Sequence, residues 1–89
     1  MAIDKVRISD YDMELDSLEF VVTRGSDVRN FNVTQRALKQ MYEKYLKKTN
    51  NGGNIESSFD EDAIAILSFI RSKGGEEWVK KEIDNLVDL

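Results

Sequence analysis

The sequence predicts a single α+β domain over residues 1–89, in which a three-stranded antiparallel β-meander is followed by three helices packed on one sheet face. Apolar and polar residues alternate between Tyr11 and Val33, and two separate turn signals place the same apolar residues on one face. From Thr34 onward the apolar residues recur every three or four positions, which is typical of amphipathic helices. We expect the meander over about 3–33, helices over about 34–48, 58–73 and 76–88, and a mobile loop over 49–57.

The first turn is expected at Asp16-Ser17, as a two-residue hairpin loop that pairs Leu15 with Leu18. Asp-Ser is a weaker turn signal than Asn-Gly, so a slightly longer loop is the alternative. In this register the core face of the first two strands carries Tyr11, Met13, Leu15, Leu18, Phe20 and Val22. The opposite face carries Asp12, Glu14, Glu19, Val21 and Thr23. Residues 3–8 are expected to add a short strand or a frayed lead-in.

The second turn is expected at Arg24-Gly25-Ser26-Asp27, where glycine occupies the first central position, as type II′ turns prefer. This turn predicts that Leu18 pairs with Val33, Phe20 with Phe31 and Val22 with Arg29. Arg24 and Asp27 flank the turn as an oppositely charged pair. Because both turns assign the same residues to the core, they support one meander.

The first helix follows from the spacing of its apolar residues, which are Leu38, Met41, Tyr42 and Tyr45. Thr34 is the expected N-cap, and Lys47 and Lys48 suit the negative C-terminal end of the helix dipole. The asparagine- and glycine-rich segment 49–54 should end this helix.

The second and third helices have their own start and stop signals. Ser58 and Glu61 have the spacing of a capping box, and Gly74-Gly75 should end the second helix after Lys73. The third helix begins at Glu76 and has Val79, Ile83, Leu86 and Val87 on one face, with Trp78 beside it. The second helix should be the most buried, through Phe59, Ala63, Ile64, Ile66, Leu67, Phe69 and Ile70.

The composition excludes several classes of chemistry. The 89 residues are 40% hydrophobic and 34% charged, which is the balance of a soluble globular domain. The chain has no cysteine and no histidine, so disulfides, thiolate nucleophiles, histidine bases and His-ligated zinc are excluded. We therefore expect a non-enzymatic protein without a cofactor, located in the cytoplasm and not associated with a membrane.

Four acids alternate in the segment Asp10-Tyr-Asp-Met-Glu-Leu-Asp16, and four interpretations are open. The solvated face of an ordinary strand is the first. A calcium loop starting at Asp10 would need glycine where Leu15 stands and a bidentate acid where Val21 stands. A carboxylate pair of Glu14 and Glu19 is a third interpretation. The fourth is an acidic partner-binding face formed by Asp12, Glu14 and Glu19.

The basic charge is concentrated in residues 34–50, which carry five basic and one acidic side chain. These basic residues are Arg36, Lys39, Lys44, Lys47 and Lys48. They could contact phosphates, or they could be the solvated face of an amphipathic helix. The acids expected on the outer sheet face would repel a nucleic acid, so nucleic acid is not the expected partner.

The segment Tyr11 to Met41, about a third of the chain, resembles a family of small bacterial proteins, domain-of-unknown-function family fourteen-eighty-eight. The resemblance rests on Tyr11-Asp12, the strand motif Leu18-Glu-Phe20, the hairpin turn after it, and Ala37-Leu38 at a helix start. The chain departs from the family pattern in the segment 49–57 and in its C-terminal third. The resemblance implies a fold of hairpin and helices and implies no activity or functional residue.

We expect a protein–protein interaction or regulatory module whose partner is a protein, bound at the acidic sheet face or the acidic C-terminal helix. One alternative is a phage or mobile-element anti-defence inhibitor that mimics nucleic acid with its acids. Another is a weak nucleic-acid binder that uses the basic first helix. An exposed edge strand also makes a homodimer a reasonable expectation.

Overall fold

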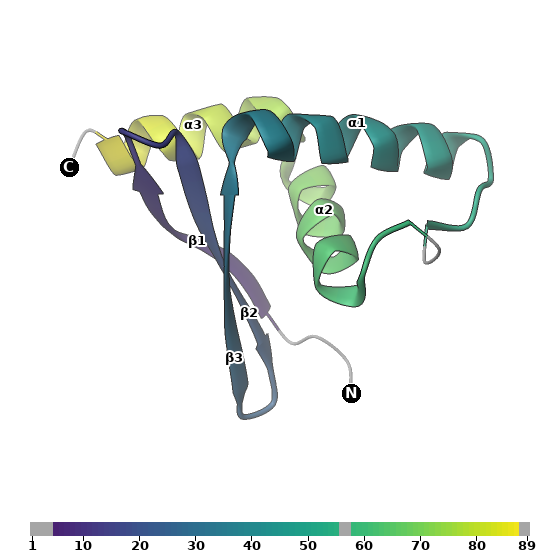
Figure 1. Cartoon of the computed structure of the whole chain (residues 1–89), viewed down its shortest axis with the longest axis horizontal. Helices are drawn as coiled ribbons and strands as arrows, with labels where there is room; N and C mark the ends of the chain where they lie inside the picture. The colour runs from purple at the N-terminus through teal and green to yellow at the C-terminus, as the bar shows by residue number, and fades with distance from the viewer. Residues whose placement is uncertain (1–4, 56–57, 88–89) are drawn as a thin grey trace.

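The computed structural model describes residues 5–55 and 58–87. Strands β1 (Lys5–Asp12), β2 (Ser17–Arg24) and β3 (Asp27–Thr34) form one antiparallel sheet in the order β1-β2-β3. Helices α1 (Gln35–Asn50), α2 (Glu61–Lys73) and α3 (Glu76–Val87) follow (Figure 1). The predicted α+β meander with three helices is confirmed. Residues 3–4, 56–57 and 88 of the expected elements lie outside the described residues.

The second hairpin forms as predicted. Phe20 pairs with Phe31, Leu18 with Val33 and Val22 with Arg29. Gly25 has a φ of 55°, in the left-handed region that the first central position of a type II′ turn requires. The turn sequence and the apolar alternation therefore suffice to fix the register of β2 and β3.

The first hairpin forms with a longer loop, and the register predicted for a two-residue loop is wrong. β1 ends at Asp12, Tyr11 pairs with Leu18, and residues 13–16 form a four-residue turn. The Asp12 carboxylate accepts hydrogen bonds from the backbone N–H groups of Glu14 (2.9 Å) and Leu15 (3.2 Å), which closes the turn. Met13 and Leu15, expected in the core, are therefore 69% and 67% exposed.

Asp16, the last turn residue, has a φ of 51°. Its carboxylate accepts a hydrogen bond from the Tyr11 hydroxyl at 2.5 Å, and its carbonyl accepts from the N–H of Gln35 at 2.7 Å. The hydrogen bond to Asp16 raises the pKa of Tyr11 above its ordinary value. These contacts tie the β1–β2 turn to the start of α1.

A register shift between Ile8 and Asp10 interrupts the β1–β2 ladder. Ile8 pairs with Phe20 before the shift, and Asp10 pairs with Glu19 after it, which leaves Ser9 as the extra residue of a β-bulge. The extra residue reverses the alternation of β1. Ile8 and Tyr11 therefore both pack against the core although they are three residues apart.

Two of the helix starts were predicted and one was not. The Thr34 hydroxyl caps α1 by accepting from the N–H of Ala37 at 3.1 Å, and α3 begins at Glu76. The predicted capping box at Ser58 is wrong, because α2 begins at Glu61 and its N-cap is Asp60, which accepts from the N–H of Ala63 at 2.7 Å. Ser58 instead receives a hydrogen bond from the Lys48 ammonium.

The core lies between the sheet and the three helices. α1 and α3 extend across the top of the view in Figure 1, and α2 descends from them beside the sheet. β2 contributes Leu18, Phe20 and Val22, which are at most 1% exposed. The helices contribute Leu38, Tyr42, Tyr45, Ile66, Leu67, Ile70, Val79 and Ile83. All three helices therefore pack on one sheet face.

Candidate functional site

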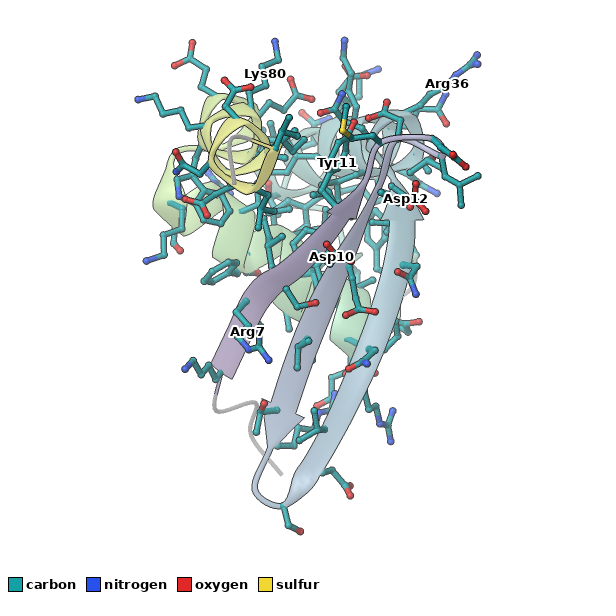
Figure 2. The ribbon with its side chains drawn as sticks, turned by 90° about the vertical axis from the view of Figure 1, so that its left-hand side faces the viewer. Arg7, Asp10, Tyr11, Asp12, Arg36 and Lys80 are labelled. Carbon is teal, nitrogen blue, oxygen red and sulfur yellow. The ribbon has the colours of Figure 1, made fainter. Side chains whose placement is uncertain are left out.

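The sheet has a second face that no helix covers, and we call it the open face (Figure 2). Its residues alternate with those that β2 buries, because neighbouring side chains of a strand point to opposite sides. The open face consists of Lys5, Arg7, Asp10 and Asp12 on β1, Ser17, Glu19, Val21 and Thr23 on β2, and Val28, Asn30, Asn32 and Thr34 on β3.

The charges of the open face are separated along its length. Lys5 and Arg7 lie at the end where β1 begins, and Asp10 and Asp12 follow beyond the bulge. Figure 2 shows Arg7, Asp10 and Asp12 in this order along β1. Glu19 pairs with Asp10, so the face has a cationic end and an acidic end. Val21 lies between these two charged ends, and its exposed fraction is only 6%.

The acids predicted from the sequence are solvent-accessible but do not form the predicted row. Asp12 is exposed at the end of β1, and Glu14 is exposed in the turn beyond it. The predicted cross-strand pair of Glu14 and Glu19 is wrong, because Glu19 faces Asp10. The four-residue turn causes this difference, since it moves the partner of Glu19 back along β1.

The bulge residue Ser9 supports the acidic end. Its hydroxyl donates a hydrogen bond to the carboxylate of Glu19, with a distance of 2.5 Å between Oγ and Oε1. This bond fixes Glu19 next to Asp10, where two like charges oppose each other across the strands. The odd spacing of Ile8 and Tyr11 is the only sequence signal that indicates the bulge.

The basic residues predicted on the first helix divide into two groups. Arg36, Lys39, Lys44 and Lys47 are exposed, and Lys48 is partly buried. Lys44 and Lys48 also contact the segment before α2: the Lys44 ammonium lies 5.6 Å from the centre of the Phe59 ring, and Lys48 bonds to Ser58.

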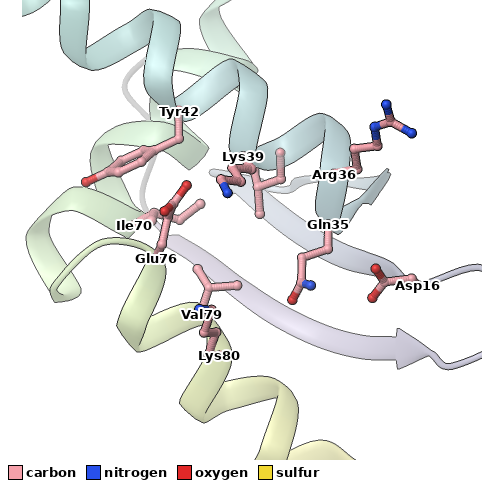
Figure 3. Close-up of a pocket in the computed structure, with 10 residues that line it drawn as sticks. Asp16, Gln35, Arg36, Lys39, Tyr42, Ile70, Glu76, Val79 and Lys80 are labelled. Carbon is pink, nitrogen blue, oxygen red and sulfur yellow. The ribbon is translucent and has the colours of Figure 1, made fainter.

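A pocket of about 300 Å³ lies between α1, α3 and the β1–β2 turn (Figure 3). Leu38, Ile70 and Val79 form its apolar part, and Lys39 and Lys80 also line it. Arg36 lines its rim, and Figure 3 shows its guanidinium directed away from the pocket. Asp16 and Glu76 also line the pocket. The Oε1 atom of Glu76 is buried and has no hydrogen-bond partner among the described residues. The pocket thus combines an apolar wall with charges of both signs.

The tyrosine at the inner end of this pocket is Tyr42, which is 7% exposed. Burial raises the pKa of Tyr42 above its ordinary value, and Arg71 partly opposes the rise. Gly75 has a φ of 82°, and a Cβ atom at this position would lie 3.1 Å from the Tyr42 hydroxyl. The glycine therefore allows α3 to start close to Tyr42.

An ion-pair cluster on the core side joins the β2–β3 hairpin to the start of α2. Asp62 is 7% exposed and accepts from Arg24 at 2.7 Å and from Arg29 at 3.1 Å. Arg24 also reaches Glu61 at 3.2 Å. The predicted pairing of Arg24 with Asp27 holds in the backbone register, but the guanidinium turns to α2. Arg24 and Asp62 are its shielded members, and the cluster fixes the hairpin against α2.

The described residues contain no group of three or more carboxylate, histidine or cysteine side chains arranged to hold a metal ion. None of the described helices is both long enough and apolar enough to cross a lipid bilayer.

Comparison of the chain with family models, with curated proteins and with solved structures found no match. The resemblance of residues 11–41 to a bacterial family therefore stays a prediction.

Proposed function

We propose that this chain is a non-enzymatic protein-binding module that meets a protein partner through the open face of its sheet. The proposal is supported by the positions of the charges on one uncovered face. Lys5 and Arg7 lie at one end of this face, and Asp10, Asp12 and Glu19 lie at the other. An uncovered face alone is ordinary for an antiparallel sheet. A face with two charged ends also orients a partner of complementary charge and speeds its docking.

The charge pattern determines which partner chemistry fits. The partner would present cations opposite Asp10, Asp12 and Glu19, and carboxylates opposite Lys5 and Arg7. An inhibitor that mimics nucleic acid needs a uniformly anionic surface, so the two cations on the open face weigh against that alternative. A protein with a mixed charged surface is the better fit.

The test removes charge from the acidic end without removing its hydrogen bonds. The face variant carries Asp10→Asn, Asp12→Asn and Glu19→Gln, because an amide oxygen can still accept the bonds from Ser9 and from the β1–β2 turn. The control variant carries Glu43→Gln, Glu77→Gln and Asp84→Asn, which change the net charge equally at exposed positions of α1 and α3.

Both variants and the parent would be immobilised, and the proteins captured from an extract of the native cells would be quantified by mass spectrometry. We expect the face variant to hold its partner about tenfold more weakly, since three exposed charge contacts each contribute about 0.5 kcal/mol. The control should capture as the parent does. Equal capture by the two variants, or no captured protein, would show that the proposal is wrong.

A second candidate function is the binding of an anionic ligand, including nucleic acid, beside the pocket. It is favoured by the gathering of Arg36 and Lys39 from α1 with Lys80 from α3. The test is fluorescence anisotropy of a labelled single-stranded oligonucleotide at increasing salt. Arg36→Gln with Lys39→Gln should flatten the dependence of log affinity on log salt, and Lys73→Gln with Lys81→Gln should not. No binding at low salt would remove this candidate.

A further inference from the structure

The sheet has two edge strands, and they differ in how well they are protected. β1 carries a bulge and four charged residues, and each edge strand has a helix packed against it, α3 on β1 and α1 on β3. Bulges and charges are the usual means by which proteins prevent an edge strand from pairing with another chain. β3 pairs with β2 without interruption from Asp27 to Thr34 and has no lysine and no proline. β3 is therefore the edge that remains open to strand addition.

The open part of β3 is its first half. Residues 27–30 are all exposed, and from Phe31 onward alternate residues are partly covered. At its other end β3 runs directly into α1, which begins at Gln35. Figure 1 shows the β2–β3 turn extending beyond the helices, so a second chain can approach this half.

The turn geometry determines which backbone groups of β3 are available. A two-residue hairpin loop makes Arg24 and Asp27 a hydrogen-bonded pair, and such pairs recur at every second residue. The N–H and C=O groups of Arg29 therefore face β2. Those of Val28 and Asn30 are directed to the open edge.

The segment around Val28 is complementary in charge to a second, antiparallel copy of itself. Val28 is 62% exposed, with Asp27 before it and Arg29 after it. If a second β3 runs antiparallel about Val28, each Asp27 lies opposite an Arg29 of the other copy, and the two Val28 side chains meet on the symmetry axis. This register also keeps the open faces of both sheets on the same side, because it pairs residues of equal parity.

We propose that the chain self-associates through an antiparallel β3–β3 contact centred on Val28, which joins two sheets into one continuous sheet. The occupant is a second copy because the same exposed segment carries both charges of each cross-strand pair. The Arg29 side chain binds Asp62 of its own chain at 3.1 Å through Nη1 and is still 56% exposed. The overlap is short, so the dimer is weak and its population depends on concentration. Because this contact uses the sheet edge, it extends the open face and leaves it accessible to another partner.

The experiment is sedimentation equilibrium of the full chain from about 10 μM to about 1 mM, the range in which weak interfaces dissociate. We expect reversible dimerisation of the parent that weakens with salt. Asp27→Lys places like charges opposite each other and should weaken the dimer at least about tenfold. Asp84→Lys makes the same charge change on α3 and should leave the dimer unchanged.

A second variant tests the backbone contact. Val28→Pro removes an N–H that β2 does not use, and proline is tolerated on edge strands, so the chain should fold and remain monomeric. Val28→Ala keeps the N–H and should still dimerise. A parent that is monomeric throughout the range would overturn the proposal, as would a dimer that Asp27→Lys and Val28→Pro leave intact.

Discussion

Arg24 and Asp62, 38 residues apart in the sequence, lie 2.7 Å apart between Nη2 and Oδ1, which joins the β2–β3 hairpin to the first turn of α2. The side chains of Arg24 and Asp62 are 16% and 9% exposed. A pair this shielded from water is costly to break, because without Asp62 the shielded Arg24 keeps only the exposed Glu61 as an ion-pair partner.

Asp62→Ala should therefore lower the free energy of unfolding by about 3 kcal/mol. Urea denaturation followed by circular dichroism measures this loss. Glu61→Ala is the matched control, since its side chain is 68% exposed and its ion pair with Arg24 should contribute less than about 1 kcal/mol. Equal losses in the two variants would contradict the assignment of Asp62 as the central residue of the cluster.

Asp12 has a structural role in the β1–β2 turn in addition to its charge. Asp12→Ala removes the acceptor for the N–H groups of Glu14 and Leu15, and should cost about 1 kcal/mol of stability. Asp12→Asn keeps an acceptor and should remain within about 0.5 kcal/mol of the parent. Chemical denaturation of both variants distinguishes the two roles. A fully stable Asp12→Ala chain would mean that the turn does not depend on this carboxylate.

Gly75 should tolerate no side chain. Gly75→Ala forces a left-handed φ of 82° and brings a methyl group to 3.1 Å from the Tyr42 hydroxyl, so it should cost about 2–3 kcal/mol. Gly52→Ala is the control, since its φ is 71° but no atom lies within 4 Å of the added carbon. It should cost about 1 kcal/mol from backbone strain alone. Thermal melts of both variants test the ranking, and a larger loss at Gly52 would refute it.

Tyr42 should make stability sensitive to alkaline pH. Burial raises the pKa of Tyr42 in the folded chain, whereas in the unfolded chain it stays near its ordinary value of about 10. The folded state therefore holds this proton more tightly, so the stabilisation is present below pH of about 10 and is lost as pH rises through the folded pKa. Tyr42→Phe should lose less stability than the parent above this pH, as urea titrations at several pH values would show. A steeper loss in the variant would contradict this sign.

The second hairpin could be predicted from the sequence and the first could not. At Arg24-Gly25-Ser26-Asp27 a glycine at the position that needs a positive φ fixes the turn, and the register follows. Near Asp16 the alternation of Tyr11, Met13 and Leu15 continues through the turn itself, so the pattern does not show where β1 ends. The position of the turn follows instead from the hydrogen bonds that the Asp12 carboxylate accepts from the turn N–H groups.

The candidate site was predictable only in part. Alternation alone placed Asp12 and Glu19 on the solvated side, because β2 has one apolar and one mixed face. The pairing of Asp10 with Glu19 depends on the bulge, in which Ser9 is the one inserted residue. The Asp62 cluster joins parts of the chain that no local pattern relates, since a helix start favours an acid for its dipole in any case.

We expect a protein partner to bind at the open face and not at the helical layer. A photo-crosslinking benzophenone amino acid at Thr23, on the open face, tests it most directly when compared with the same residue at Lys47 on α1. We expect a crosslink from Thr23 to a specific protein in native cells and none to that protein from Lys47. A crosslink to that protein from Lys47 and not from Thr23, or no crosslink from Thr23, would contradict it.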